Sequence, residues 1–266
     1  MKIHMPDTSH MVSLRTLWKE AFGDTDVFLD TFFRTAYSHE RCRVMTIDDN
    51  VVAALYWFDC SYNCQPNDNK RIAYIYAVAT ATSSRRQGLC HKLMKDTHEH
   101  LKNTGYDGAL LVPANDKLFS FYEKMGYKVS CHIDELVVKG ICDNYNCQAG
   151  TITEINKDDF AKRRHTLLPE RSVIQEKENL DFLETQAKFF TGRDFLLSAR
   201  TESDTLYGLE LLGDTSVAPF IVYALGCSNG IFRTPGSNKP FAMYLSFADN
   251  GSDAGVPPSY FAFAFD

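Results

Sequence analysis

Basic side chains are in slight deficit in this sequence. Lys and Arg number 28 and Asp and Glu number 34, which gives a formal charge of -6 at pH 7. A surface that binds nucleic acid needs clustered Lys and Arg to neutralise a run of phosphates, and nothing basic accumulates here. We therefore expect no nucleic acid among the partners of this protein.

Long apolar segments are also missing. The longest, residues 51–58, is far short of the ~20 residues that a membrane-spanning helix needs. The first stretch, MKIHMPDTSH, has no apolar signal core. The expected location is the cytoplasm, with no membrane partner.

Cysteines with metal-site spacing are absent. The eight cysteines form no C-x-x-C motif, and no His stands at a finger-like offset from them. Neither a zinc site nor a disulfide framework is favoured, so we expect no metal and mostly reduced, structural thiols.

The composition present is that of a folded chain, with 44% hydrophobic and 23% charged side chains over 266 residues. This length favours one to two domains. The sequence turns polar and irregular at GICDNYNCQAG, so we place a boundary there. The prediction is a domain at residues 1–145 and a smaller α/β domain at residues 146–266.

The first domain alternates helical and strand periodicity. Helices are predicted at 11–22, from about 25, at 88–103 and at 117–125, and strands at 42–47, 51–58, 71–80, 109–112, 127–132 and 135–138, with a polar loop at 63–70. This order predicts an α/β (α+β) fold in which helices flank a mixed central sheet with a parallel crossover.

The second domain is predicted to have a shorter version of the order of helices and strands in the first. A helix carrying Leu180, Leu183, Ala187 and Phe190 precedes strands at 195–199 and 206–212, a helix at 218–225 and strands at 241–247 and 260–265. No motif repeats, so an internal duplication stays open. The basic run Arg163, Arg164 and His165 reads as a solvated helix face.

One junction has the chemistry of a phosphate site. Arg85, Arg86, Gln87 and Gly88 lie between an apolar strand and a helix. The first N–H groups of a helix have no intrahelical partner, and the helix dipole favours an anion there. Gly88 would let the backbone approach the anion closely. By physics alone, an ordinary solvated loop is the stronger alternative.

The same residues resemble a known family. Arg85, Gly88 and Cys90 follow the R-x-x-G-x-G/A pattern of the acetyl-CoA pyrophosphate loop in the GNAT superfamily of N-acetyltransferases, with Cys90 in place of the usual small residue. Further on, NDKLFSFYEKMGYK resembles the second signature, an Asn followed by F-Y-x-x-x-G-[YF]. The resemblance covers about residues 1–140 and implies a GNAT-like fold there.

The resemblance also implies residue roles. The backbone of Val78, Ala79 and Thr80 would receive the pantetheine arm, with an N–H near Val78 polarising the thioester carbonyl. Asn115 would bind the CoA arm, and the Tyr122 hydroxyl would face the CoA sulfur. The loop and first helical turn would bind the pyrophosphate, through Arg85, Arg86, Gln87, Gly88, Leu89, Cys90 and His91.

The implied reaction is attack of a neutral amine on acetyl-CoA. An alkylamine of pKa ~10.4 must lose a proton first, and the departing thiolate of pKa ~8.5 benefits from a donor such as Tyr122. A core tyrosine is the alternative for Tyr122. The base stays open, because each candidate taken alone is better explained as a solvated or structural residue. The candidates are Tyr74, Tyr76, Asp59, His132, Asp134 and Glu135.

The first half of the chain carries both GNAT signatures, and the second half carries no R-x-x-G-x-G/A pattern of its own. In this respect the chain resembles tandem-GNAT enzymes of the enhanced-intracellular-survival kind, but it lacks their third domain. In those enzymes the second unit, here a degenerate GNAT-like domain, binds no CoA and the chain terminus enters the active site. The tail SYFAFAFD reads as a strand that buries its phenylalanines. Asp266 would then contribute two carboxylates as base; an edge strand ending in solvent is the alternative.

These observations predict an acetyl-CoA-dependent N-acetyltransferase acting on a primary amine of a small molecule or peptide. Two rivals stay open: a non-catalytic acyl-CoA-binding or regulatory protein, and a structural interaction module. A mildly acidic protein slightly favours a cationic acceptor. An oligomer is possible.

Overall fold

The computed structural model of the protein describes residues 1–141, 151–248 and 256–265. The chain forms two compact units, each built from both halves of the sequence. As far as they are described, unit 1 combines Met1–Lys128, Lys177–Phe182 and Met243–Val256, and unit 2 combines Val129–Glu176, Leu183–Ala242 and Pro257–Asp266. The predicted boundary at 145/146 lies outside the described residues and stays a prediction.

Two capped helices open unit 1 after the short strand β1 (Lys2–His4). Helix α1 (Met11–Phe22) buries a stripe of three side chains and ends where Gly23 adopts a left-handed conformation, with φ 76°. Helix α2 (Asp26–Thr35) begins at Thr25, whose side chain accepts a hydrogen bond from a backbone N–H. Both helices confirm the sequence prediction. The buried stripe of α1 is Leu14, Leu17 and Trp18.

The sheet of unit 1 follows the order β1, β2, β3, β4, β5, with the end of β13 (Lys239–Ser246) beside β5. All neighbours are antiparallel except β4 and β5. The parallel crossover is therefore confirmed. The new strands are β2 (Cys42–Ile47), β3 (Asn50–Gln65), β4 (Asp68–Thr80) and β5 (Gly108–Leu111).

The predicted polar loop at 63–70 is wrong. Strands β3 and β4 continue through it and pair as far as Gln65 and Asp68. A tight turn closes this hairpin at Asn67, which adopts a left-handed φ of 65° that Asn tolerates well. Polar side chains therefore marked an exposed hairpin and not irregular chain.

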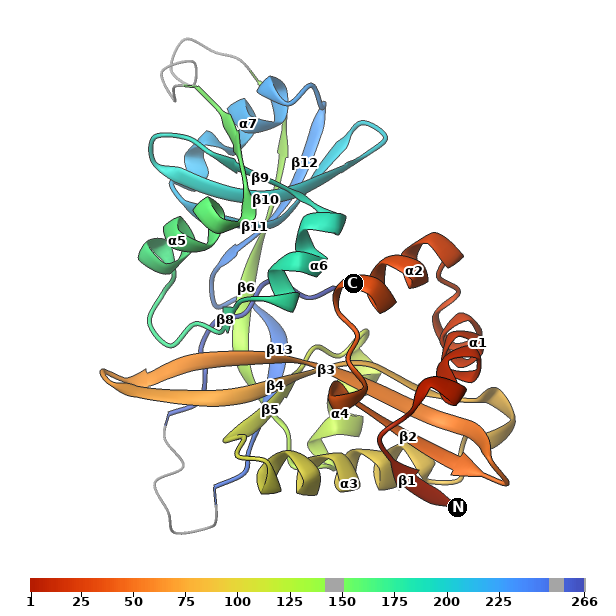
Figure 1. Cartoon of the computed structure of the whole chain (residues 1–266). Coiled ribbons are helices and arrows are strands. Elements are labelled where there is room, and N and C mark those ends of the chain that lie inside the picture. Colours follow the sequence, from red (N-terminus) through yellow and green to blue (C-terminus); the bar gives the residue numbers. More distant parts are fainter. Residues whose placement is uncertain (142–150, 249–255, 266) are drawn as a thin grey trace. The chain divides into compact units, whose positions relative to one another are not determined.

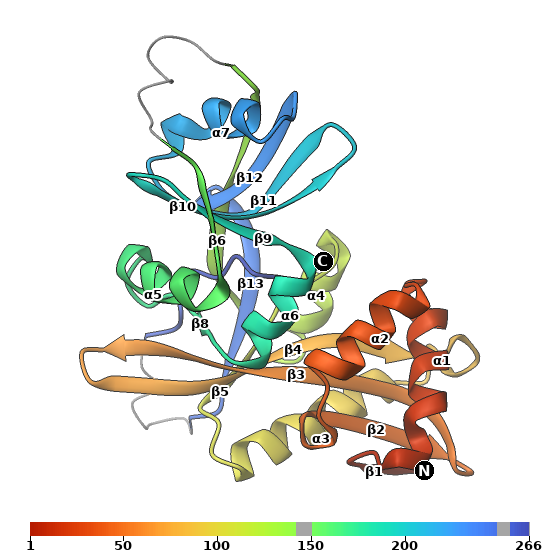
Figure 2. The same ribbon diagram turned by 45° about the horizontal axis from the view of Figure 1, so that its top comes forward.

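Helices cover both faces of this sheet. Figures 1 and 2 show α1 and α2 on one face and α3 (Leu89–Asn103) on the other. Helix α3 connects β4 to β5, and the short helix α4 (Asp116–Glu123) follows β5. Both helices confirm their predicted positions to within a few residues. The buried side chains of α3 are Leu89, Leu93, Met94, Thr97 and Leu101.

The sheet strands of unit 2 pair in the order β6, β12, β11, β10, β9, β7. Strand β6 is one continuous strand where two were predicted. Strands β11 and β12 are parallel, and α7 (Ala218–Ala224) connects them. These strands are β6 (Lys128–Lys139), β7 (Thr153–Ile155), β9 (Lys188–Thr191), β10 (Phe195–Glu202), β11 (Thr205–Gly213) and β12 (Asn229–Pro235), and the two-residue strand β8 (Ile174–Gln175) is outside this order.

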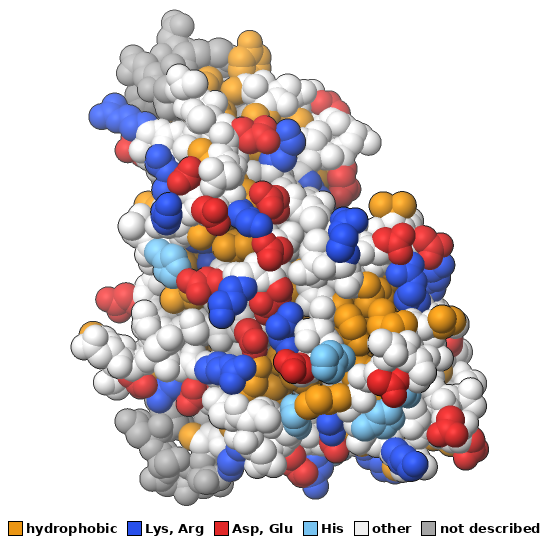
Figure 3. Space-filling model, viewed as in Figure 1, with side chains coloured by type: hydrophobic (Ala, Val, Ile, Leu, Met, Phe, Trp, Pro, Cys, Tyr) orange, Lys and Arg blue, Asp and Glu red, His pale blue; other side chains and the backbone are white. Residues whose placement is uncertain are grey.

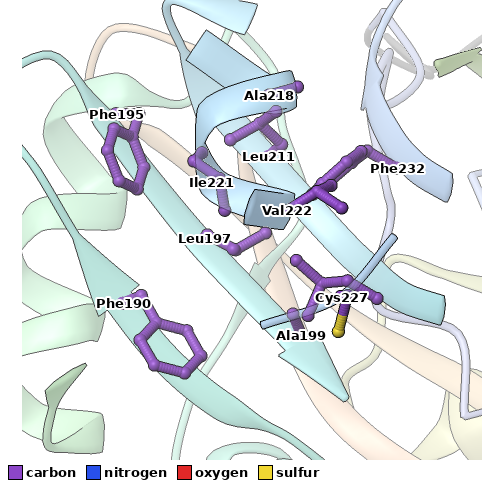
Figure 4. Close-up of a cluster of buried hydrophobic side chains, with 11 residues drawn as sticks. Phe190, Phe195, Leu197, Ala199, Leu211, Ala218, Ile221, Val222, Cys227 and Phe232 are labelled. Atoms are coloured by element: carbon purple, nitrogen blue, oxygen red, sulfur yellow. The ribbon is translucent and has the colours of Figure 1, made fainter. Parts of the chain in front are cut away.

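The core of unit 2 lies between this sheet and α7 (Figure 4). Ile221 and Val222 of α7 meet Leu197 and Leu211 of the central strands. The Phe232 ring lies so close to Gly208 that a Cβ there would fall 2.2 Å from it. The complete cluster of buried side chains is Phe190, Phe195, Leu197, Ala199, Leu206, Leu211, Ala218, Ile221, Val222, Cys227 and Phe232.

The two units repeat one pattern. In each, an antiparallel pair of strands (β3 and β4, or β10 and β11) leads through a helix into a parallel strand. That last strand then pairs with an antiparallel neighbour from the other half of the sequence: β5 with β13, and β12 with β6. The repeated order is consistent with two similar halves, the possibility that the sequence left open.

Two predictions for the second half are wrong, and one strand was missed. The helix predicted through Phe190 is α6 (Glu178–Gln186), and Phe190 lies on β9 because that segment pairs with β10. Strand β12 was not predicted. The tail was predicted as a strand, but residues 260–264 are buried without forming one, and Phe265 is partly buried. A single bridge joins Tyr260 to Ser172.

Surface charge is mixed. The face in Figure 3 shows basic and acidic side chains interspersed, without a continuous basic area. Among the residues that the structure describes, no helix is both long and apolar enough to cross a bilayer.

Candidate active site

A bulge interrupts strand β4 where the resemblance placed the thioester contact. Ala54 pairs with Ala79 and Tyr56 with Tyr76, so Leu55 stands opposite two residues, Ala77 and Val78. Ala77 adopts a left-handed φ of 49°, which is uncommon for a residue with a side chain. A bulge leaves the extra residue out of the regular ladder, so the register with β3 skips Ala77 and Val78.

Strands β4 and β5 pair over a short length. Their parallel register covers Ile72 to Tyr74 on β4 and ends before the bulge. The edge of β4 from residue 75 to Thr80 therefore has no strand partner on its β5 side among the described residues. Such a free strand edge can accept an extended ligand through main-chain hydrogen bonds. Val78 and Thr80 are partly exposed there, and the side chain of Ala79 is buried.

The predicted phosphate loop, residues 85–88, lies directly before α3. Gly88 is the N-cap residue of α3, with a left-handed φ of 74° and no side-chain cap. The N–H groups of the first turn, those of Leu89, Cys90 and His91, have no acceptor in the described part of the chain. A Cβ on Gly88 would meet no atom within 4 Å. The start of α3 is therefore an open group of N–H donors suited to an anion.

Both arginines of the loop are exposed. The Nε of Arg85 donates to the carbonyl of Thr80 at 3.0 Å, which fixes the stem of this side chain and leaves its other N–H donors for a ligand. Arg86 adopts a left-handed φ of 63°. Gln87 is also exposed. These side chains can add charged and neutral hydrogen bonds to a phosphate that the backbone holds.

The loop is also fastened to α1. The carboxylate of Glu20 accepts the backbone N–H of Thr82 at 2.5 Å. Hydrogen bonds from Thr82 lower the pKa of Glu20, so the carboxylate stays charged near neutral pH. Nothing in the sequence indicates this contact, because the two residues are 62 positions apart.

Helix α4 brings Asn115 and Tyr122 into the same unit. Asn115 is the N-cap of α4: its side-chain oxygen accepts the N–H of Lys117 at 3.1 Å, so its NH2 group stays available to a ligand. Tyr122 is buried, and burial, together with the nearby Cys90 thiol, raises the pKa of its hydroxyl above the usual range. Because Cys90 belongs to the first turn of α3, this electrostatic effect indicates that Tyr122 lies near that turn. Burial also raises the pKa of Cys90 to about 11, so this thiol is not a nucleophile at neutral pH.

Three of the six candidate bases, Asp59, Asp134 and Glu135, have structural partners. Asp59 accepts a hydrogen bond from Tyr106 and lies near Arg71. Its backbone N–H donates to Glu178 at 3.0 Å, within unit 1.

In unit 2, Asp134 accepts the N–H groups of Ser237 and Asn238, both at 3.0 Å, and Glu135 pairs with Lys239. Asp266 lies outside the described residues, so its role stays a proposal. The described residues include no group of His, Cys, Asp and Glu placed to hold a metal ion.

A hydrogen bond between His98 and Tyr127 lies next to Tyr122 and was not predicted. The imidazole Nε2 of His98, on α3, lies 2.8 Å from the hydroxyl of Tyr127, and the Tyr127 ring contacts that of Tyr122 with centroids 5.9 Å apart. The G-[YF] end of the second signature marks Tyr127. No sequence signal marks His98 as its partner.

A comparison with protein families finds one match for this chain. The acetyltransferase (GNAT) domain family matches residues 2–130. No curated protein matches the sequence.

Three solved structures share the fold over both halves of the chain. A GCN5-related N-acetyltransferase from Kribbella flavida superposes with a TM-score of 0.69 at 13% identity, covering 91% of this chain and 70% of its own. A probable N-acyltransferase from Enterococcus faecalis V583 gives 0.71 at 15%, covering 92% and 72%. Eis1 from Mycobacterium abscessus gives 0.64 at 12%, covering 88% and 66%. At these identities the structures show a common fold, and the domain match adds the family: residues 2–130 of this chain form a GNAT acetyltransferase domain.

Proposed function

We propose that this protein is an acetyl-CoA-dependent N-acetyltransferase of the cytoplasm, which transfers acetyl to the primary amine of a small molecule or peptide. One observation carries the proposal: unit 1 combines a strand edge that opens at a bulge, unpaired N–H groups at the start of α3, and the buried Tyr122 near that first turn. The strand edge would hold the thioester, the N–H groups would bind the diphosphate, and Tyr122 would protonate the leaving thiolate.

The chemistry assigned to these groups is a direct transfer. The nitrogen of the neutral amine forms a bond to the acetyl carbon, and the bond from that carbon to the CoA sulfur breaks. The N–H beside Val78 stabilises the oxyanion of the tetrahedral intermediate. The amine loses its proton to a base or to water, and Tyr122 donates a proton to the departing thiolate.

The test of this function is thiol release. Wild-type protein is mixed with acetyl-CoA and a panel of small cationic amines and lysine peptides, and free CoA is followed with a thiol reagent. We expect amine-dependent CoA release well above the rate without protein. Acetyl-CoA binding without turnover on any amine would favour the rival, a non-catalytic acyl-CoA-binding or regulatory protein.

Gly88→Val should weaken acetyl-CoA binding at least tenfold. The new side chain would stand where a phosphate meets the first turn of α3, and a β-branched residue strains a left-handed backbone. A ligand at a hundredfold excess over Kd stabilises the native state by about 2.7 kcal/mol, and a tenfold loss of affinity reduces this to about 1.4 kcal/mol. The measurement is the rise in melting temperature on adding acetyl-CoA.

Gly105→Val is the matched control for Gly88→Val. Gly105 follows the other end of α3 and also has a left-handed φ, of 84°, and a Cβ at this position would likewise meet no atom within 4 Å. This variant has the same backbone strain without the phosphate site, so it should keep the full shift. Equal shifts in the two variants would remove the loop from the binding site.

We further propose Asp266 as the group that receives the amine proton, through its side chain or its α-carboxylate. Residues 260–264, which precede it, are buried in unit 2, so the tail is held firmly up to that point. Deleting Asp266, or extending the C-terminus with a short tag, should lower kcat/KM for amines by tenfold or more while acetyl-CoA binding persists. Unchanged turnover in both variants would remove the tail from the mechanism.

A further inference from the structure

Tyr127 contacts Tyr122 through a backbone hydrogen bond and through its ring. Its N–H donates to the Tyr122 carbonyl at 3.2 Å, and the two rings meet edge to face, at 67°. Tyr127 is buried, with 1% of its surface exposed. Any movement of the Tyr127 ring would therefore disturb the ring of Tyr122.

His98 holds the other end of Tyr127. Its Nε2 shares a hydrogen bond of 2.8 Å with the Tyr127 hydroxyl, and its ring also contacts Phe247. Burial lowers the pKa of His98 to about 4, so the imidazole is neutral at working pH, with one donor and one acceptor nitrogen. His98 belongs to α3, the helix whose first turn forms the anion site.

Helix α4 needs an anchor of this kind. It has eight residues, and Tyr122 is its one buried side chain. A helix this short is marginal without tertiary contacts. The turn that leaves it is closed by Met125 and Tyr127, whose N–H groups both bond to the Tyr122 carbonyl. The link from Tyr127 to His98 therefore connects the helix carrying Tyr122 to the helix carrying the loop.

We propose that His98 and Tyr127 are a positioning pair that fixes the Tyr122 hydroxyl relative to the first turn of α3. The inference rests on the proposed function, because it assigns Tyr122 a place beside the leaving thiolate. Neither residue contacts the reacting atoms in this scheme. Their contribution is geometric, and a misplacement of about 1 Å can cost on the order of a hundredfold in rate.

Kinetics in two backgrounds separate positioning from general support of the fold. His98→Leu should lower kcat about tenfold in the wild type, with KM for acetyl-CoA within about twofold, and His98→Gln should restore most of it. In the Tyr122→Phe background His98→Leu should have no further effect on kcat, because the hydroxyl that it positions is gone. An equal loss in both backgrounds would overturn the proposal.

Tyr127→Phe serves where His98→Leu does not fold, since it keeps the ring and removes only the hydroxyl. It should give the same pattern in both backgrounds. His100→Leu is the matched control: His100 is on α3 as well, and its ring lies against Trp57 and not against Tyr127. It should leave kcat unchanged.

A second readout does not depend on turnover. With 3-fluorotyrosine at position 122 alone, the fluorine resonance should be single and narrow in otherwise wild-type protein. His98→Leu should shift or broaden it, and His98→Gln should restore it. An unaltered resonance in His98→Leu would overturn the positioning pair even if the enzyme acetylates amines. An altered one would support the pair even if no amine is acetylated, an outcome that would count only against the proposed function.

Discussion

Replacing Tyr122 with Phe is expected to lower kcat by ~10²-fold, with KM for acetyl-CoA nearly unchanged. The phenylalanine ring keeps the buried packing against Tyr127 and removes only the proton donor. Because burial raises the pKa of the Tyr122 hydroxyl, the group stays protonated throughout the neutral and mildly alkaline range. The wild-type pH profile of kcat should therefore show no loss of this acid below pH ~10, the ordinary pKa of tyrosine.

Steady-state thiol release measures this effect, with Tyr223→Phe as the control. Tyr223 lies on α7 in unit 2 with 55% of its surface exposed, so losing its hydroxyl should change neither kcat nor the melting temperature. Acetyl-CoA should raise the melting temperature of Tyr122→Phe as much as that of the wild type. Full activity in Tyr122→Phe would show that water protonates the thiolate and that Tyr122 is a core residue.

Local signals were sufficient for most of unit 1. Helix α1 has its apolar stripe and a terminal glycine, α2 has Thr25 as a cap, and α3 begins directly after Gly88. These features are decided within a few residues along the chain, so the sequence reveals them. The predicted phosphate loop rests on the same kind of local signal, because its glycine and arginines are close together in the sequence.

Features that depend on distant pairing were not visible in the sequence. The bulge at Ala77 follows from its register with β3, and alanine carries no signal for a left-handed backbone. Strand β13 completes the sheet of unit 1 although it lies more than a hundred residues beyond β5, whose partner it is. Pairing of this kind overrides the local sequence pattern.

In the basic run of the second half, the burial of one side chain also depends on a distant partner and was not predicted. Arg163 and His165 are exposed, as a solvated helix face requires, but Arg164 is buried and the prediction for it is wrong. Helix α5 (Lys157–Leu167) turns only Phe160 and Arg164 inward. The partner that offsets the cost of burying this arginine, Glu210, lies 46 positions away on β11.

Arg164→Met should destabilise the protein by about 3–5 kcal/mol, because it leaves the Glu210 carboxylate buried without its charge partner. The guanidinium makes two hydrogen bonds to this carboxylate, at 2.6 and 3.0 Å, and both side chains are nearly inaccessible, with 3% and 1% exposed. It also lies over the ring of Phe263, 4.4 Å from its centroid, so the substitution loosens the buried tail as well. The measurement is the urea midpoint of unfolding followed by circular dichroism.

Two further variants decide whether the lost ion pair is the cause. Arg163→Met removes the exposed neighbouring arginine, whose one hydrogen bond in the described residues is to Thr191 at 3.4 Å, and should shift the midpoint little. The double variant Arg164→Met with Glu210→Leu removes both charges and should recover most of the stability, since well-packed apolar residues can replace a buried ion pair at little cost. If Arg164→Met unfolds no more easily than Arg163→Met, the pair contributes nothing to unit 2. If the double variant is no more stable than Arg164→Met alone, the loss comes from packing against Phe263 and not from the stranded carboxylate.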